Sequence, residues 1–351
     1  MEEKKKFKLG LLPKLIIAII IGILFGQFLP EGFCRFVVTL SSFFSQFLSF
    51  IIPLMILAYV TMGIANLKSG AGRLLLITVA LAYCSTLIAG SASFFVADTL
   101  FPHFMSADAL DRIAATAGNS LEPYFSLEIP ALMNTLSAVV LAFVLGIGMA
   151  NLKGDSMLKV FRDLQNIVSG VLRHVIIPLI PVHIAGLFAN ISAEGRLAAT
   201  VKMFASLYAI IIVLQLLYIL SQFLLASGVC RKNHLKSIKN VAPAYFTALG
   251  TQSSASTIPV ALNCAYSNNV NRDVADFVVP LCATINLNGD TICLVLGSMG
   301  IMLASGMNPT LAVFAPFILM LGVTMVAAPG VPGGGVMAAL GLITSMLGFT
   351  D

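Results

Sequence analysis

Thr247–Leu262 (TALGTQSSASTIPVAL) and Val326–Gly341 (VAAPGVPGGGVMAALG) each interrupt an apolar run with a short Ser-rich or Pro/Gly-rich segment. A third interruption, Asn286–Asp290 (NLNGD), lies between them inside another hydrophobic run. Unpaired backbone groups cannot face lipid, so a broken helix at membrane depth is tolerated only where protein buries it or where it lines a cavity. The three interruptions therefore predict a binding site at the middle of a membrane, as in secondary transporters.

The composition agrees that lipid surrounds this chain. Hydrophobic residues make up 58% of the sequence and charged residues 10%, against roughly 25% charged residues in soluble domains. The six cysteines form no Cys-x-x-Cys pair and lie mostly in apolar runs, and the four histidines are scattered. We therefore expect no disulfide framework, no resident metal and no cofactor.

Six apolar stretches precede the interrupted ones, and each is about as long as a helix that crosses a bilayer, ~20 residues or more. They run over 11–29, 36–66, 74–101, 129–152, 164–191 and 197–229. The first follows a lysine cluster, as in a signal peptide, but its apolar run is longer and no small-residue cleavage site follows. We therefore expect a multi-pass membrane protein that retains this first span.

The positions of Lys and Arg predict the orientation in the membrane. Basic residues spread over short loops form no stripe for a nucleic acid, so the net charge of +5 does not indicate one. We expect a cytoplasmic N-terminus and location in the bacterial cytoplasmic (inner) membrane. With this orientation 15 of the 20 basic residues are cytoplasmic: Lys4, Lys5, Lys6, Lys8, Lys14, Lys68, Arg73, Lys153, Lys159, Arg162, Arg231, Lys232, Lys236, Lys239 and Arg272.

Beyond residue 239 the uninterrupted apolar segments become shorter and pair into hairpins. Residues 240–268 are expected to enter from the cytoplasm and return to it, 274–303 to cross outward with an interruption, and 310–350 to enter from outside. Hairpins that enter from opposite faces are typical of inverted-repeat transporters. The sequence therefore predicts an all-α polytopic membrane protein with two re-entrant helical hairpins.

The interruptions carry groups that suit an anion and a cation. Helix N-termini present free N–H groups and a positive dipole end, which suit a carboxylate, whereas unwound carbonyl groups suit a monovalent cation. Ser253, Ser254 and Ser256 add hydroxyl donors, and glycines let the backbone approach a ligand. A Ser-rich apolar segment alone is more typical of close helix packing, but its pairing with Pro332 and three successive glycines favours a ligand site.

These motifs resemble those of the dicarboxylate/amino acid:cation symporters, the family that includes the glutamate transporters. Residues 253–259 (SSASTIP) resemble the family's serine-rich hairpin motif, 286–290 its Asn-Met-Asp-Gly-Thr break and 329–335 its Ala-Gly-Val-Pro-Gly tip. The resemblance implies an inverted-repeat, elevator-type transporter that forms a homotrimer. Its static scaffold would comprise 1–70 and 129–194, and its moving transport part 71–128 and 195–351.

The resemblance also implies roles for individual residues. Those expected at the substrate, an amino acid or dicarboxylate, are Ser253, Ser254, Ser256, Asp290, Val331 and Gly335. Those expected at the transported cation, Na⁺ or H⁺, are Tyr83, Thr86, Cys282, Thr284, Asn286, Asn288, Asp290, Met325, Val326 and Ala328. The second hairpin would be the outer gate, with the tip residues Pro329, Gly330, Pro332, Gly333 and Gly334.

Two departures from the family pattern affect the assignment of these roles to residues of this sequence. Asn288 replaces the family's acidic residue and Asp290 replaces a threonine that faces the substrate side chain, so the negative charge has moved two positions. A carboxylate there would repel an acidic side chain, which favours a neutral amino acid, unless Asp290 is protonated or binds the cation instead. The family also has an eighth span, which we expect this sequence to lack.

Other interpretations of the same residues stay open at this point. Tyr83 and Thr86, taken singly, are more typical of packing residues than of cation ligands. An ion channel would need a continuous pore in place of two opposed gates. An intramembrane aspartyl protease would need a second carboxylate beside Asp290, and Asp276 lies too far along the helix to be that partner.

Overall fold

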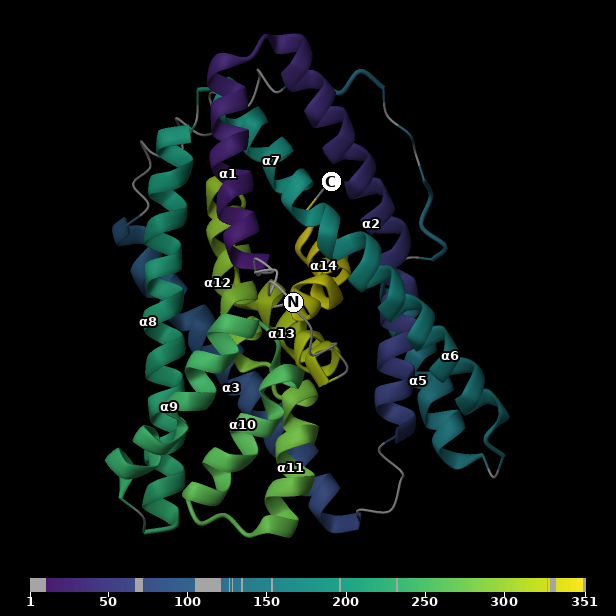
Figure 1. The fold of residues 1–351 in the computed structure, drawn as a ribbon, viewed down its shortest axis with the longest axis vertical. Helices are drawn as coiled ribbons and strands as arrows, with labels where there is room; N and C mark the ends of the chain where they lie inside the picture. Colours follow the sequence, from purple (N-terminus) through teal and green to yellow (C-terminus); the bar gives the residue numbers. More distant parts are fainter. Residues whose placement is uncertain are drawn as a thin grey trace, which may run out of the picture.

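The computed structural model describes residues 11–66, 72–104 and 121–349, apart from 126, 128, 134, 153, 196, 232, 327 and 329–332. All regular elements in this part of the chain are helical (Figure 1), so the predicted all-α class is confirmed. The helices are α1 (Leu11–Phe28), α2 (Glu31–Asn66), α3 (Gly72–Phe104), α5 (Thr135–Asn151), α6 (Ser156–Val171), the π-helical turn η2 (Leu172–Ile176), α7 (Ile177–Ala193), α8 (Leu197–Val229), α9 (His234–Thr251), α10 (Ser254–Ser267), α11 (Arg272–Ile285), α12 (Asn288–Ala304), α13 (Leu311–Val326) and α14 (Gly334–Leu347).

Five helical stretches of the described residues are long and apolar enough to cross a membrane: α2, α3, α6 to α7, α8, and α11 to α12. Three predicted spans differ from the structure at their N-terminal ends. The span predicted over 36–66 begins earlier, at Glu31. The span predicted over 129–152 becomes helical only at Thr135. The span predicted over 164–191 begins earlier, at Ser156, because the polar helix α6 continues through η2 into α7 without a break.

Helices α1, α2, α5, α6 and α7 pack into one group, here called group A. Glycines let α1 lie directly on α7, since a Cβ at Gly26 would come within 2.8 Å of the Ala193 amide nitrogen. Small residues are the usual means of close helix contact in membranes. A hydrogen bond of 2.7 Å between Ser41 Oγ and His183 Nδ1 joins α2 to α7.

Helices α3 and α8 to α14 form the second group, group B. Its densest part is the contact of α3, α12 and α13, where Phe314 and Phe317 are fully buried. Gly322 of α13 lies against the ring of Tyr83 in α3. These apolar contacts hold the interrupted helix α11–α12 inside the protein.

The contact between the two groups is apolar. Helix α14 packs against α2 and α5, and the shared core includes Ile52, Ala138 and Leu342. In the described part of the chain, hydrogen bonds between side chains of different helices join partners within one group, as Ser41 with His183 and Ser85 with Tyr218 do. Among the described residues, the contact of group B with group A is therefore formed mainly by apolar side chains.

The two hairpins attach to opposite ends of the interrupted helix (Figure 1). Helix α10 leads into α11, and α12 leads into α13, so α9–α10 and α13–α14 approach the interruption from opposite sides. The turn of the first hairpin and the break in the interrupted helix are both shorter than predicted. Only Gln252 and Ser253 separate α9 from α10, and only Asn286 and Leu287 separate α11 from α12. Ser254 and Ser256 thus lie in the first turn of α10 rather than in an unwound tip.

Candidate functional site

The break between α11 and α12 leaves one side-chain oxygen without a partner. Asn286 ends α11 with its backbone N–H donating to the Cys282 carbonyl at 3.1 Å. Its Oδ1 atom is buried and accepts no hydrogen bond from the described residues. A buried acceptor that lacks a donor is costly, so this oxygen suits a bound cation. Thr284, two residues earlier, instead donates its hydroxyl to the Leu281 carbonyl.

Asn288, the first residue of α12, is held by both atoms of its amide. Its Nδ2 donates to Ser85 Oγ at 2.8 Å, and its Oδ1 accepts from Thr86 Oγ1 at 3.2 Å. Thr86 is fully buried and also reaches the Ala82 carbonyl. The structure therefore brings together Thr86 and Asn288, which the sequence assigned to the same cation site, and joins them by a hydrogen bond.

Asp290 and Gly335 are in direct contact. Asp290 lies in the first turn of α12, and Gly335 lies in the first turn of α14. A Cβ at Gly335 would come within 2.7 Å of Asp290 Cγ and closer still to Oδ2. The carboxyl group is thus next to the N-termini of two helices, whose partial positive charge favours an anion. Among the described residues, no hydrogen bond or ion pair satisfies this carboxyl group.

The serines of the first hairpin mostly bond within it. Gln252 turns the chain in the left-handed region, with φ of 52°, and Ser253 then caps α10. The Ser253 hydroxyl accepts from the Ser256 N–H at 3.3 Å, and the Ser253 carbonyl accepts from Thr257 Oγ1 at 2.9 Å. This hairpin packs against α8 and α11. The structure does not bring its serines into contact with Asp290.

The remaining predicted residues fall into four sets. Tyr83 donates its hydroxyl to the Leu319 carbonyl of α13 at 3.3 Å, so it faces the second hairpin rather than the break. Met325 and Ala328 are buried at the end of α13, and Val326 is its last residue. Gly333 and Gly334 begin the turn into α14, with Gly333 at φ of 73°. Val331 and the gate residues Pro329, Gly330 and Pro332 lie outside the described residues.

Sequence reasoning missed a set of polar residues around the break. Gln215, Tyr218 and Gln222 of α8 reach Ser85 or Gly289. They stand at positions i, i+3 and i+7, which share one face of a helix. A polar face on an otherwise apolar span was the available signal, because polar residues in membrane helices usually turn toward protein.

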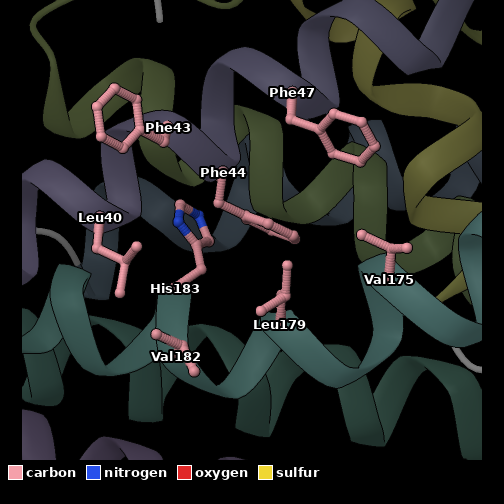
Figure 2. Close-up of a pocket in the computed structure, with 8 residues that line it drawn as sticks. All are labelled: Leu40, Phe43, Phe44, Phe47, Val175, Leu179, Val182 and His183. Carbon is pink, nitrogen blue, oxygen red and sulfur yellow. The ribbon is translucent and has the colours of Figure 1, made fainter.

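A separate cavity of about 190 Å³ lies between α2 and α7 (Figure 2). Its lining is apolar except for His183, whose Nδ1 is already bonded to Ser41. The cavity therefore offers no anchor for a charged or zwitterionic substrate. The lining residues are Leu40, Phe43, Phe44, Phe47, Val175, Leu179, Val182 and His183.

Two opposed hairpins around a broken membrane helix, with an unpaired oxygen and a carboxyl group at the break, define a polytopic secondary transporter. The chain belongs to the sodium:dicarboxylate symporter family, whose family model matches residues 11–351. It is 26% identical to a serine/threonine transporter SstT of Acinetobacter baumannii over 341 residues, 94% of this chain and 84% of the relative. The SstT of A. baumannii strain SDF is 27% identical over 341 residues, which again cover 94% of this chain and 84% of the relative. Membership identifies the chain as a cation-coupled symporter, with sodium as transported cargo.

Proposed function

We propose that this symporter couples Na⁺ entry to the uptake of a small neutral amino acid of the serine or threonine type. The observation that carries the proposal is the contact of the Asp290 carboxyl group with Gly335 at the start of α14. A carboxylate at this point repels the side chain of an acidic amino acid, and more strongly where water is excluded, whereas the ammonium group of an amino acid offsets the charge of its own α-carboxylate. The name of the related serine/threonine transporters supports the same substrate class.

The proposed cation site is centred on the unpaired Asn286 oxygen. Buried carbonyl oxygens at interrupted helices are the usual ligands of transported Na⁺. The further donors we propose are carbonyl groups of Cys282, Thr284, Met325, Val326 and Ala328, with Tyr83, Thr86 and Asn288 beside them. Asp290 supplies the negative charge near this site.

The proposed substrate site lies between the two hairpins. The N–H groups at the start of α14, near Val331 and Gly335, would receive the substrate carboxylate together with Ser253, Ser254 and Ser256. The substrate side chain would then face Asp290. Residues 329–334 would act as the outer gate, because they join the two helices of the hairpin.

We propose an elevator motion of group B against group A, supported by the apolar contact between the groups. Movement along an apolar surface exchanges one set of apolar contacts for another. In this proposal the chain forms a homotrimer through group A in the bacterial cytoplasmic membrane, with the N-terminus in the cytoplasm.

Uptake by proteoliposomes tests this function. Labelled serine should accumulate above its external concentration when Na⁺ is higher outside, should saturate, and should stop when the Na⁺ gradient is collapsed. Excess unlabelled threonine should compete, whereas aspartate, glutamate and succinate should not. Uptake that depends on a proton gradient alone would contradict Na⁺ coupling, and strong competition by the acidic compounds would contradict the neutral substrate.

A further inference from the structure

A hydrogen-bond network joins α3, α8 and α12 at the break. Tyr218 Oη donates to the Ser85 carbonyl at 2.7 Å and lies 3.0 Å from Ser85 Oγ. Gln222 Nε2 donates to Ser85 Oγ at 2.7 Å, and Asn288 Nδ2 donates to the same oxygen at 2.8 Å. One serine hydroxyl therefore connects two neighbouring helices to the first residue of α12.

The donors and acceptors around Ser85 form a consistent set. Ser85 Oγ accepts two amide N–H groups, which use both of its lone pairs. Its own hydrogen must then point to Tyr218 Oη, whose hydrogen points to the Ser85 carbonyl. In this arrangement the Asn288 amide has Nδ2 toward Ser85 and Oδ1 toward Thr86, whose one hydroxyl hydrogen is shared between Asn288 Oδ1 and the Ala82 carbonyl.

Helix α8 makes a second contact with the same turn. Gln215 Nε2 donates to the Gly289 carbonyl at 2.9 Å, one residue beyond Asn288. The outer side of α8 is apolar and exposed, as at Leu217 and Leu225. The side chains of Gln215, Tyr218 and Gln222 are thus directed at Ser85 or at the start of α12, where their hydrogen bonds replace those that lipid cannot provide.

We propose that Ser85, Tyr218 and Gln222 are positioning residues that set the affinity of the cation site without touching the cation. Their hydrogen bonds fix Asn288. This residue lies two positions after Asn286, which is the first residue of the break between α11 and α12. Holding the first turn of α12 holds the Asn286 oxygen at the place where it meets the cation. The inference rests on the proposed function, since it takes Asn286 as a cation ligand.

The test compares Ser85→Ala, Tyr218→Phe and Gln222→Leu with two matched controls in proteoliposomes. Ser93→Ala removes a buried α3 hydroxyl that bonds only within its own helix, to the Ala89 carbonyl. Ser221→Ala removes an exposed α8 hydroxyl that donates to the Tyr218 carbonyl of the same helix. Ser85→Thr retains a hydroxyl at position 85 and serves as the conservative variant. The readouts are the Na⁺ concentration that gives half-maximal serine uptake, and the serine KM at saturating Na⁺.

Ser85→Ala and Gln222→Leu should raise the half-maximal Na⁺ concentration about tenfold, the scale at which loss of an outer partner weakens metal binding. Tyr218→Phe should also raise the half-maximal Na⁺ concentration. The serine KM at saturating Na⁺ should stay near that of the wild type in all three variants. Ser85→Thr should have a Na⁺ affinity near that of the wild type. A merely structural role would lower the amount of folded protein and leave the Na⁺ dependence unchanged.

Two outcomes overturn the inference and can be told apart. If wild-type uptake is Na⁺-dependent and Ser85→Ala and Gln222→Leu match the controls in Na⁺ dependence, the positioning role is wrong and the proposed function stands. If wild-type uptake does not depend on Na⁺, the proposed function fails and the inference fails with it. Gln222→Leu carries the test alone if Ser85→Ala does not fold.

Discussion

Gly335 and Asp290 touch: a Cβ on Gly335 would lie 2.7 Å from Asp290 Cγ and 3.1 Å from its Cβ. The first turn of α14, the second helix of the second hairpin, thus lies directly against the carboxyl group that follows the break. This contact links the gate to the charge of the site, because neither can move without changing the surroundings of the other.

Gly335→Ala should overcrowd this contact and reduce serine uptake about fivefold or more, since overpacking of this degree costs roughly 1–3 kcal/mol. Asp290→Ala in the same chain removes the two carboxyl atoms nearest the new methyl group and should restore membrane insertion and part of the uptake. Gly297→Ala, on α12 with open space around it, is the control. Unchanged uptake kinetics in Gly335→Ala would contradict the placement of the gate.

Asp290→Thr should broaden the substrate range to acidic amino acids. Two like charges 4 Å apart repel by about 4 kcal/mol at an effective dielectric of about 20, which corresponds to more than a hundredfold in affinity. Competition of labelled serine uptake by aspartate, measured in wild type and in Asp290→Thr at neutral pH, checks this. The expectation is wrong if aspartate competes equally well in both.

Asn286→Ala should weaken cation binding by removing the unpaired Oδ1 atom. We expect the half-maximal Na⁺ concentration for uptake to rise at least about tenfold, because a direct ligand is lost. Asn263→Ala, an exposed position on α10, provides the same chemical change away from the break. A Na⁺ dependence equal to that of Asn263→Ala would exclude Asn286 as a ligand.

Gly26→Val should destabilise group A. A side chain at this position would meet the Ser192 Cβ at 2.6 Å and force α1 away from α7, at a cost of about 1–3 kcal/mol. The measurement is the midpoint of thermal unfolding in detergent, compared with Gly148→Val, where the side chain enters open space. Equal midpoints for the two variants would show that the α1–α7 contact tolerates separation.

Much of the fold could be predicted because its signals are local. Apolar length located the spans, and the Ser-rich and Gly-rich interruptions located both hairpins. The limits of the turns could not be predicted, because they depend on capping. Ser253 caps α10 with its side chain, so Ser254 and Ser256 become helical. Helix α12 likewise begins directly after Leu287, so it includes Asn288, Gly289 and Asp290.

The partners of individual site residues were the part that the sequence could not supply. Thr86 and Asn288 were expected near one another, and they are bonded. Tyr83 was expected at the same place, yet its hydroxyl reaches Leu319 on the second hairpin. Which neighbour a residue meets depends on how helices far apart in the chain are packed and rotated. For the same reason, the network of Ser85, Tyr218 and Gln222 could not be predicted from the sequence.

The attachment of α8 has a consequence for handling the protein outside its native membrane. Neutral hydrogen bonds are strong in an apolar medium but compete poorly with water. Water that reaches the inner face of α8 would therefore offer Gln215, Tyr218 and Gln222 alternative partners. We expect α8 to be among the first helices to loosen in short-chain detergents, and added lipid to preserve Na⁺ affinity during purification.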